Sequence, residues 1–140
     1  RSEPVRGTAQ VELGESVLVH SHRFIHAMLT VDAVRTAVHR AGVIPELAAF
    51  MARAATVLSV AERAVRASAP PRSTPRLRPL QEDLTAALTA GAELFEDPAT
   101  AAALVDATDR ITNSLDTLLA ELRRQLGRAD STAAAASAGR

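Results

Sequence analysis

Three of the four histidines in this 140-residue chain lie close together, at His20, His22 and His26. On a helix, His22 and His26 stand one turn apart on the same face, and two imidazoles at that spacing can chelate a transition metal. Only Glu15 is placed to add a carboxylate from the same helix, and there is no Glu-x-x-His motif. The helical projection also puts the pair on the polar side, away from Phe24. We therefore expect His22 and His26 to form a polar contact face and no metal site.

A second candidate surface is basic, because five arginines fall in one stretch that contains no acidic residue. The stretch lies between Glu62 and Glu82, and the zero formal net charge of the whole chain conceals it. Such a surface can sit against anionic lipid head groups, at about 1 kcal/mol per basic residue. The alternative is that one arginine complements a helix C-terminus while the others keep a proline-rich segment solvated. The five residues are Arg63, Arg66, Arg72, Arg76 and Arg78.

Three aspartates and an asparagine recur at helical spacing late in the chain, a pattern that can be compared with the paired carboxylates of acid–base sites. The stripe lies opposite an apolar row, and its first aspartate stands four residues before an arginine. We therefore expect Asp106 and Arg110 to form an ordinary surface ion pair, and we expect the same of Glu62 and Arg66. The stripe consists of Asp106, Asp109, Asn113 and Asp116.

Composition argues against several other kinds of chemistry. The chain has no Cys, which excludes disulfides and thiolate-ligated metal sites. It has no Lys for Schiff-base chemistry, no glycine-rich phosphate loop and no nucleophile elbow. The 16 basic residues balance the 16 acidic ones, which argues against a nucleic-acid partner. We accordingly expect no enzyme activity and no cofactor.

Apolar residues recur at helical spacing in four segments, which predicts helices over about 15–41, 45–69, 80–96 and 98–126. The rows in the second and fourth segments step by 4, 3, 4, 3 and 4 residues, the spacing of one buried helix face. In chain order, the expected buried positions are Phe24, Ile25, Met28, Val31, Val34 and Val38; Leu47, Met51, Ala54, Leu58, Ala61 and Val65; Leu80, Leu84, Leu88 and Phe95; and Leu104, Thr108, Ile111, Leu115, Leu118 and Leu122.

Glycine, proline and aspartate mark the expected helix ends. Gly42 suits the left-handed position that follows a helix, and Pro45 suits the first turn of the next one. Asp97 can cap the last helix, and Gly127 is expected to end it.

Four prolines in ten residues forbid helix over 70–79 and favour an extended linker there. The fold class that we expect is all-α: an antiparallel four-helix bundle over 15–127, made of two helical hairpins joined by this linker. Residues 1–14 would form an N-terminal extension and 128–140 a disordered tail, with the alternative that the alanine-rich part of the tail is helical. A core of Leu, Val and Ala buries modest area per contact, so we expect the bundle to depend on a partner.

Two segments carry a resemblance to a known family. They are Ser21 to Ala33 (SHRFIHAMLTVDA) and Asp106 to Asp116 (DATDRITNSLD). Over about residues 15–126, the chain resembles the soluble C-terminal region of actinobacterial FUSC proteins, the fusaric-acid-resistance or aromatic-acid-exporter-like family. The resemblance implies a helical cytoplasmic domain placed after membrane helices, in a parent protein that exports small organic or aromatic acids. It brings no catalytic or cofactor residue to this chain.

Two functional hypotheses follow. The first is a non-catalytic cytoplasmic domain of a FUSC-like transporter at the cell membrane, which packs against sister domains or the rest of its parent chain and can face anionic lipid. Under this hypothesis Arg1, in place of an initiator Met, favours a piece of a longer reading frame. The most apolar window, 41–60, is interrupted by charged residues, so we expect no segment of this chain to cross a membrane. The second hypothesis is a free-standing cytoplasmic bundle that acts as a protein- or ligand-binding adaptor or regulator.

Overall fold

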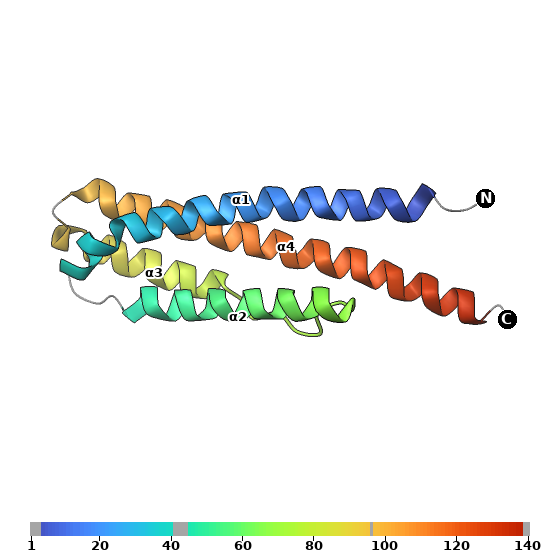
Figure 1. Cartoon of the computed structure of the whole chain (residues 1–140). Helices are drawn as coiled ribbons and strands as arrows, with labels where there is room; N and C mark the ends of the chain where they lie inside the picture. The colour runs from blue at the N-terminus through green and yellow to red at the C-terminus, as the bar shows by residue number, and fades with distance from the viewer. Residues whose placement is uncertain (1–3, 41–44, 96, 139–140) are drawn as a thin grey trace.

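The computed structural model describes residues 4–40, 45–95 and 97–138, and that part of the chain is mostly helical with no strand (Figure 1). The expected all-α fold class is therefore confirmed. The described elements are α1 (Pro4–Arg40), α2 (Pro45–Ala67), α3 (Arg78–Ala90), a short 3-10 helix (Ala92–Leu94) and α4 (Pro98–Ala138). Residues 68–77 connect α2 to α3 without helix.

The first and last helices are longer than the apolar pattern predicts. The expected extension over 1–14 is helical from Pro4, and the expected tail after Gly127 is helical as far as Ala138. A single glycine inside a helix costs only about 1 kcal/mol relative to alanine, and the alanines at 133–136 are the best helix formers. The predictions that Gly127 ends the helix and that a disordered tail follows are therefore wrong for the described residues. Gly42, the other predicted end, lies outside them.

A Schellman motif without glycine ends α2. Ser68 has a φ of 49°, in the left-handed region. Its amide donates to the carbonyl of Val65 at 3.1 Å, and the amide of Ala69 donates to the carbonyl of Ala64 at 3.1 Å. Two prolines follow directly and prevent the helix from continuing. This end lies within two residues of the predicted one.

Asp97 caps α4, as the sequence predicts. The backbone amide of Ala99 donates to Oδ1 of Asp97 at 2.9 Å. Pro98 takes the first helical position, where a missing amide hydrogen removes no helical hydrogen bond. Pro45 begins α2 in the same way. By contrast, α3 begins at Arg78, inside the predicted linker and two residues before the predicted start, and it ends at Ala90, six residues before the predicted end, where the 3-10 helix follows.

Helix α4 lies at the centre of the molecule, between α1 on one side and α2 and α3 on the other (Figure 1). Its backbone approaches all three of the other α-helices, and α2 also approaches α3. Within the described residues, the backbones of α1 and α2 do not come within 8 Å of each other, so the first expected hairpin is not a directly packed pair. The helices of the second, α3 and α4, do pack together. The coarser prediction of a helical bundle is confirmed.

The longest row of core residues comes from α4 and follows the predicted spacing. Leu104, Ile111, Leu115 and Leu122 are at most 2% exposed. Thr108 in the same row is fully buried, and its hydroxyl donates to the carbonyl of Leu104 at 2.9 Å, so its polar atom is satisfied. Other predicted positions that are buried are Leu84, Leu88 and Phe95. Leu80 and Leu118 are partly buried against this core.

The buried face of α2 is rotated from the predicted one. Ala54 and Ala61 are buried as expected, but Leu58 is 36% exposed and Val65 is 56% exposed. The physical reason is that α2 packs against both α3 and α4, which buries the face of α2 that is turned towards those two helices. That face is not the one that carries the most large apolar side chains. The additional buried residues each lie one position before a predicted one, and they are Phe50, Val57 and Ala64.

On α1, the face that meets the core is also narrower than predicted. Ala27 and Val31 are buried, and Phe24, Met28 and Val34 are partly buried against the same core. Ile25, which was expected to widen this face, is 54% exposed, because it lies on the side of α1 turned away from α4. The side chain of Val38 lies outside the described residues.

Candidate functional site

A polar cluster centred on Arg78 joins the start of α3 to α4. Nη1 of Arg78 donates to Oδ1 of Asp109 at 2.6 Å and to Oε1 of Gln81 at 3.0 Å, and Nη2 donates to Oδ1 of Asn113 at 2.5 Å. Nδ2 of Asn113 donates in turn to the second oxygen of Asp109 at 2.8 Å. Arg78, which the sequence grouped with a basic surface, is thus engaged in a contact between two helices.

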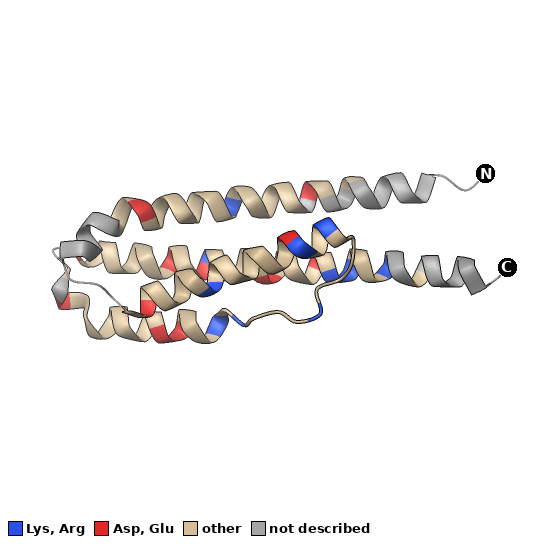
Figure 2. Cartoon of the chain, turned by 60° about the horizontal axis from the view of Figure 1, so that its bottom comes forward, with Lys and Arg blue, Asp and Glu red and all other residues tan. Residues whose placement is uncertain are grey.

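The other four arginines of the basic stretch lie at the surface. Arg63 and Arg66 are exposed near the end of α2, and Arg72 and Arg76 are exposed in the linker (Figure 2). Arg66 pairs with Glu62 at 2.8 Å, as the sequence predicts. Both partners are more than half exposed, so this pair contributes only about 0–1 kcal/mol to stability.

The fold adds a fifth basic residue to this surface, one that the sequence pattern did not indicate. Arg123 lies on α4, and its Nη2 donates to the hydroxyl of Thr74 in the linker at 3.1 Å. The two residues are 49 positions apart, so no local spacing rule reveals the contact. We define the basic surface from here on as Arg63, Arg66, Arg72, Arg76 and Arg123.

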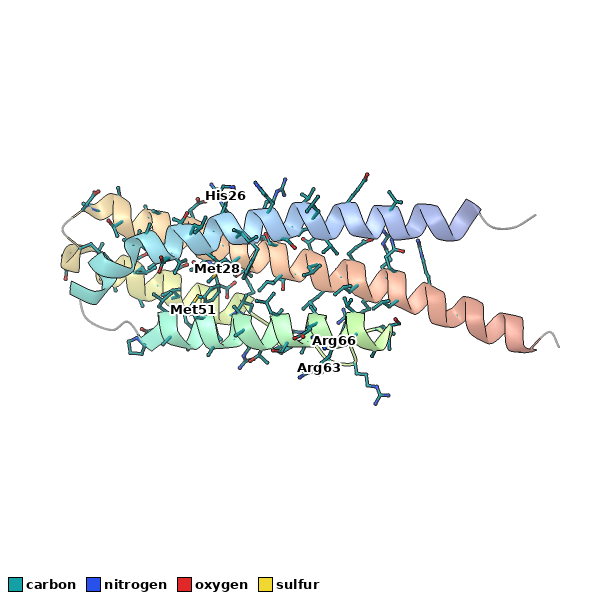
Figure 3. All side chains as sticks on the ribbon, viewed as in Figure 1. His26, Met28, Met51, Arg63 and Arg66 are labelled. Carbon is teal, nitrogen blue, oxygen red and sulfur yellow. The ribbon has the colours of Figure 1, made fainter. Side chains whose placement is uncertain are left out.

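His22 and His26 are exposed and contact each other, as the helical projection predicts. Their ring centroids are 4.5 Å apart in an edge-to-face arrangement. His26 projects from the side of α1 that is turned away from α4 (Figure 3). Within the described part of the chain, no three His, Asp or Glu side chains gather closely enough to hold a metal ion. The pair therefore offers ring nitrogens for hydrogen bonds with a partner.

His20 does not share this surface. Its Nδ1 is buried and has no hydrogen-bond partner among the described residues. It lies on the side of α1 that packs on α4, which separates it from the outward-facing pair.

The acidic stripe of α4 is divided among separate interactions. Asp106 pairs with Arg110 at 2.8 Å, as the sequence predicts. Asp109 is bound by Arg78 of another helix, and Asp116 is exposed. The described geometry therefore assigns two of the three carboxylates to ion pairs.

Glu121 makes a contribution to stability that depends on pH. Nε and Nη2 of Arg124 donate to its two carboxylate oxygens at 3.0 and 2.6 Å, and Gln125 donates to one of them at 2.9 Å. These hydrogen bonds, with that of Arg124 the strongest influence, lower the pKa of Glu121 from its usual 4.5. Because the pKa is lower in the folded than in the unfolded chain, the contribution is complete above that usual value and is lost as the pH falls through the folded pKa.

We therefore expect Glu121→Gln to lower the free energy of unfolding by about 0.5–1 kcal/mol at neutral pH, and the difference from wild type to disappear at strongly acidic pH. Urea unfolding of both proteins over a series of pH values measures the difference. Asp116→Asn, which changes an exposed acid on the same helix, is the matched control. A loss in Glu121→Gln that is the same at every pH would contradict the assignment.

A pocket of about 310 Å³ lies between α1 and α4. Arg23 of α1 and Arg110, Asn113 and Ser114 of α4 line it. The two guanidinium groups give it positive charge, but the ion pair of Arg110 with Asp106 offsets part of that charge. The lining therefore selects no particular class of ligand.

The outer side of α1 exposes large apolar side chains on a helix whose opposite side is buried. Ala27 and Val31 mark the buried side. Contiguous exposed apolar surface on a folded protein is typical of an interaction site. The exposed residues are Val11, Leu18, Val19, Ile25 and Leu29, which are between 49% and 71% exposed.

Comparison of the chain with protein-family models, with characterised proteins and with solved structures found no match. Within the described residues, no helix combines the length and the apolar character that crossing a membrane requires. The proposals below therefore rest on the chain's own residues and on the sequence resemblance described above.

Proposed function

We propose that this chain is a non-catalytic helical domain with an assembly or regulatory role, which acts by packing against another protein surface. The observation that carries this proposal is the exposed apolar row on the outer side of α1. Covering apolar surface contributes about 25 cal/mol per Å², so a partner seated on this row would stabilise the bundle.

Within this class, we propose the cytoplasmic domain of a FUSC-like membrane transporter for small organic or aromatic acids. The support is the resemblance carried by residues 21–33 and 106–116. Its partners would be sister domains, the rest of the parent chain and anionic lipid at the basic surface. If this proposal is correct, the reading frame upstream of Arg1 encodes apolar helices of about 20 residues. A start codon directly before Arg1 would contradict it and leave the free-standing adaptor or regulator.

The architecture that we propose for the domain is an antiparallel four-helix bundle. It is supported by the packing of α3 on α4 and by the start of α1 and the end of α4, which lie at the same end of the molecule (Figure 1). In this bundle α1 is attached mainly through α4, which leaves most of its circumference accessible to a partner.

Photo-crosslinking in cells that make the protein tests the assembly role. A photoreactive amino acid replaces Leu18, which is 71% exposed on the outer side of α1, or Glu82, an exposed residue of α3 that serves as the matched control. We expect illumination to join the Leu18 variant to another polypeptide and to leave the Glu82 variant unjoined. If the Leu18 variant forms no adduct, the assembly role is wrong.

A further inference from the structure

The exposed residues of α1 form a regular row that we call the outer seam. Its members step by 4, 3, 4, 3 and 4 residues, the spacing by which two helices interlock along a common line. At 100° per residue they fall within about 80° of the helix circumference, on the side opposite Ala27 and Val31. The outer seam consists of Val11, Glu15, Leu18, His22, Ile25 and Leu29, all of them exposed.

We propose that the outer seam binds the outer seam of a second copy of this chain, with the two α1 helices antiparallel. This inference rests on the proposed assembly function and names its partner. A twofold-symmetric contact requires one surface to be complementary to itself, so each residue must meet a suitable residue of the other copy. The outer seam can be tested position by position against that requirement.

The antiparallel register places every residue of the seam opposite another member of the seam. When Leu18 of one copy lies opposite His22 of the other, Val11 lies opposite Leu29, and Glu15 lies opposite Ile25. The seam extends for about 27 Å along the helix. At each of its two ends, Val11 of one copy packs against Leu29 of the other. The same pairs recur on the other side of the twofold axis, which doubles every contact.

The charges of the seam favour this direction over the parallel one. In the antiparallel register, Glu15 lies against the turn of the second copy that contains His22, Ile25 and His26. The ring centroids of the two imidazoles of that turn are 4.5 Å apart, which places both rings close to the carboxylate. The carboxylate can therefore accept a hydrogen bond from an N–H group of either ring. A parallel pair would instead place Glu15 against Glu15, two like charges across the interface, and like charges at such a contact select against it.

The position of α1 leaves room for the second copy. The row of α1 that faces α4 is buried or partly buried, whereas every residue of the outer seam is exposed. Figure 1 shows α1 along one edge of the molecule, and Figure 3 shows His26 projecting outward from that edge. A second α1 can therefore pack there without disturbing the contact with α4.

Sedimentation equilibrium of the purified chain over a range of concentrations tests the pairing. We expect the mass to rise from that of one chain, 14.7 kDa, towards twice that value. Leu18→Glu is expected to weaken the dimer by at least about tenfold. Val65→Glu changes an apolar residue on α2 that is also more than half exposed, is expected to leave the dimer intact and serves as the matched control. Circular dichroism checks that both variants remain helical.

Because the chain has no cysteine, introduced cysteines report the direction of the helices without interference. A disulfide requires two Cα atoms within about 7 Å. We expect Val11→Cys mixed with Leu29→Cys to give a disulfide between the two different chains, and neither variant alone to cross-link efficiently. Cross-linking of Val11→Cys to itself would overturn the antiparallel register.

A single-chain mass at every concentration would overturn the second copy as the partner. If the Leu18 photo-crosslink to another protein then still forms in cells, the assembly function survives and only this inference is wrong. If that crosslink is also missing, both are wrong.

Discussion

Replacing Phe50 with alanine is expected to lower the free energy of unfolding by about 3–5 kcal/mol, the range measured for large-to-small changes of fully buried aromatic residues. Phe50 is 0% exposed and is the largest fully buried side chain of α2. Its removal withdraws apolar area from the core and leaves a cavity between α2 and its neighbours. Urea unfolding followed by circular dichroism measures the loss.

The matched control is Val65→Ala on the same helix. The apolar spacing of α2 predicts that Val65 is buried and does not include Phe50, whereas the structure leaves Val65 56% exposed. We therefore expect Val65→Ala to change stability by no more than about 0.5 kcal/mol. If Phe50→Ala leaves too little folded protein to analyse, Phe50→Leu is expected to give a smaller loss in the same direction. A larger loss for Val65→Ala than for the Phe50 variants would mean that the buried face of α2 is the one with Leu58 and Val65.

The second large effect is expected at Arg78, where alanine should lower the free energy of unfolding by about 1–2 kcal/mol. The change removes three hydrogen bonds and leaves Asp109 without the cation that binds it at 2.6 Å. The expected loss stays below that of a buried charge pair because the Arg78 and Asp109 side chains are 38% and 44% exposed. Raising the salt concentration should reduce the difference from wild type.

Two variants distinguish a specific role of Arg78 from a general effect of charge. Arg78→Lys keeps the charge but lacks the planar fork that reaches Gln81, Asp109 and Asn113 together, so it should restore only part of the stability. Arg76→Ala removes an exposed linker arginine and is expected to cost less than about 0.5 kcal/mol. Equal losses in Arg78→Ala and Arg76→Ala would contradict a structural role for Arg78.

Arginine variants also test the proposed lipid contact, by co-sedimentation of the protein with vesicles that contain anionic lipid. At about 1 kcal/mol per basic residue, Arg72→Ala or Arg76→Ala should each weaken binding roughly fivefold. Arg78→Ala should leave binding unchanged under conditions where it remains folded, because its guanidinium is engaged by Asp109 and Asn113. Equal binding of the wild type to neutral vesicles would contradict an electrostatic contact.

Features that depend on near neighbours in the chain could be predicted from the sequence. Asp97 and Pro98 begin α4 as predicted, because an N-cap depends on residues within one turn. The two surface ion pairs, Glu62 with Arg66 and Asp106 with Arg110, form for the same reason. The failure at Gly127 has a local explanation too, since a glycine costs a helix little when good helix formers follow it.

Features that depend on which helices lie side by side could not be predicted in this way. The polar cluster joins Arg78 to residues 31 and 35 positions away, and Arg123 meets the linker 49 positions away. Neither contact has a counterpart in local spacing. Of the candidate site residues, the sequence therefore placed His22, His26 and the four exposed arginines at the surface, but it did not reveal that Arg78 binds Asp109 and Asn113 of α4.

The sequence by itself determined that this protein is helical and roughly where its helices lie, because helix formation depends on residues within about four positions of each other. Only the tertiary structure decided which face of each helix is buried. Helix α2 turns Phe50 and not Val65 inward because it packs against both α3 and α4. Helix α1 is apolar on two opposite sides and packs on α4 through one of them, which leaves the outer seam exposed. The burial of a face requires a neighbour, and in this chain the neighbours come from distant segments.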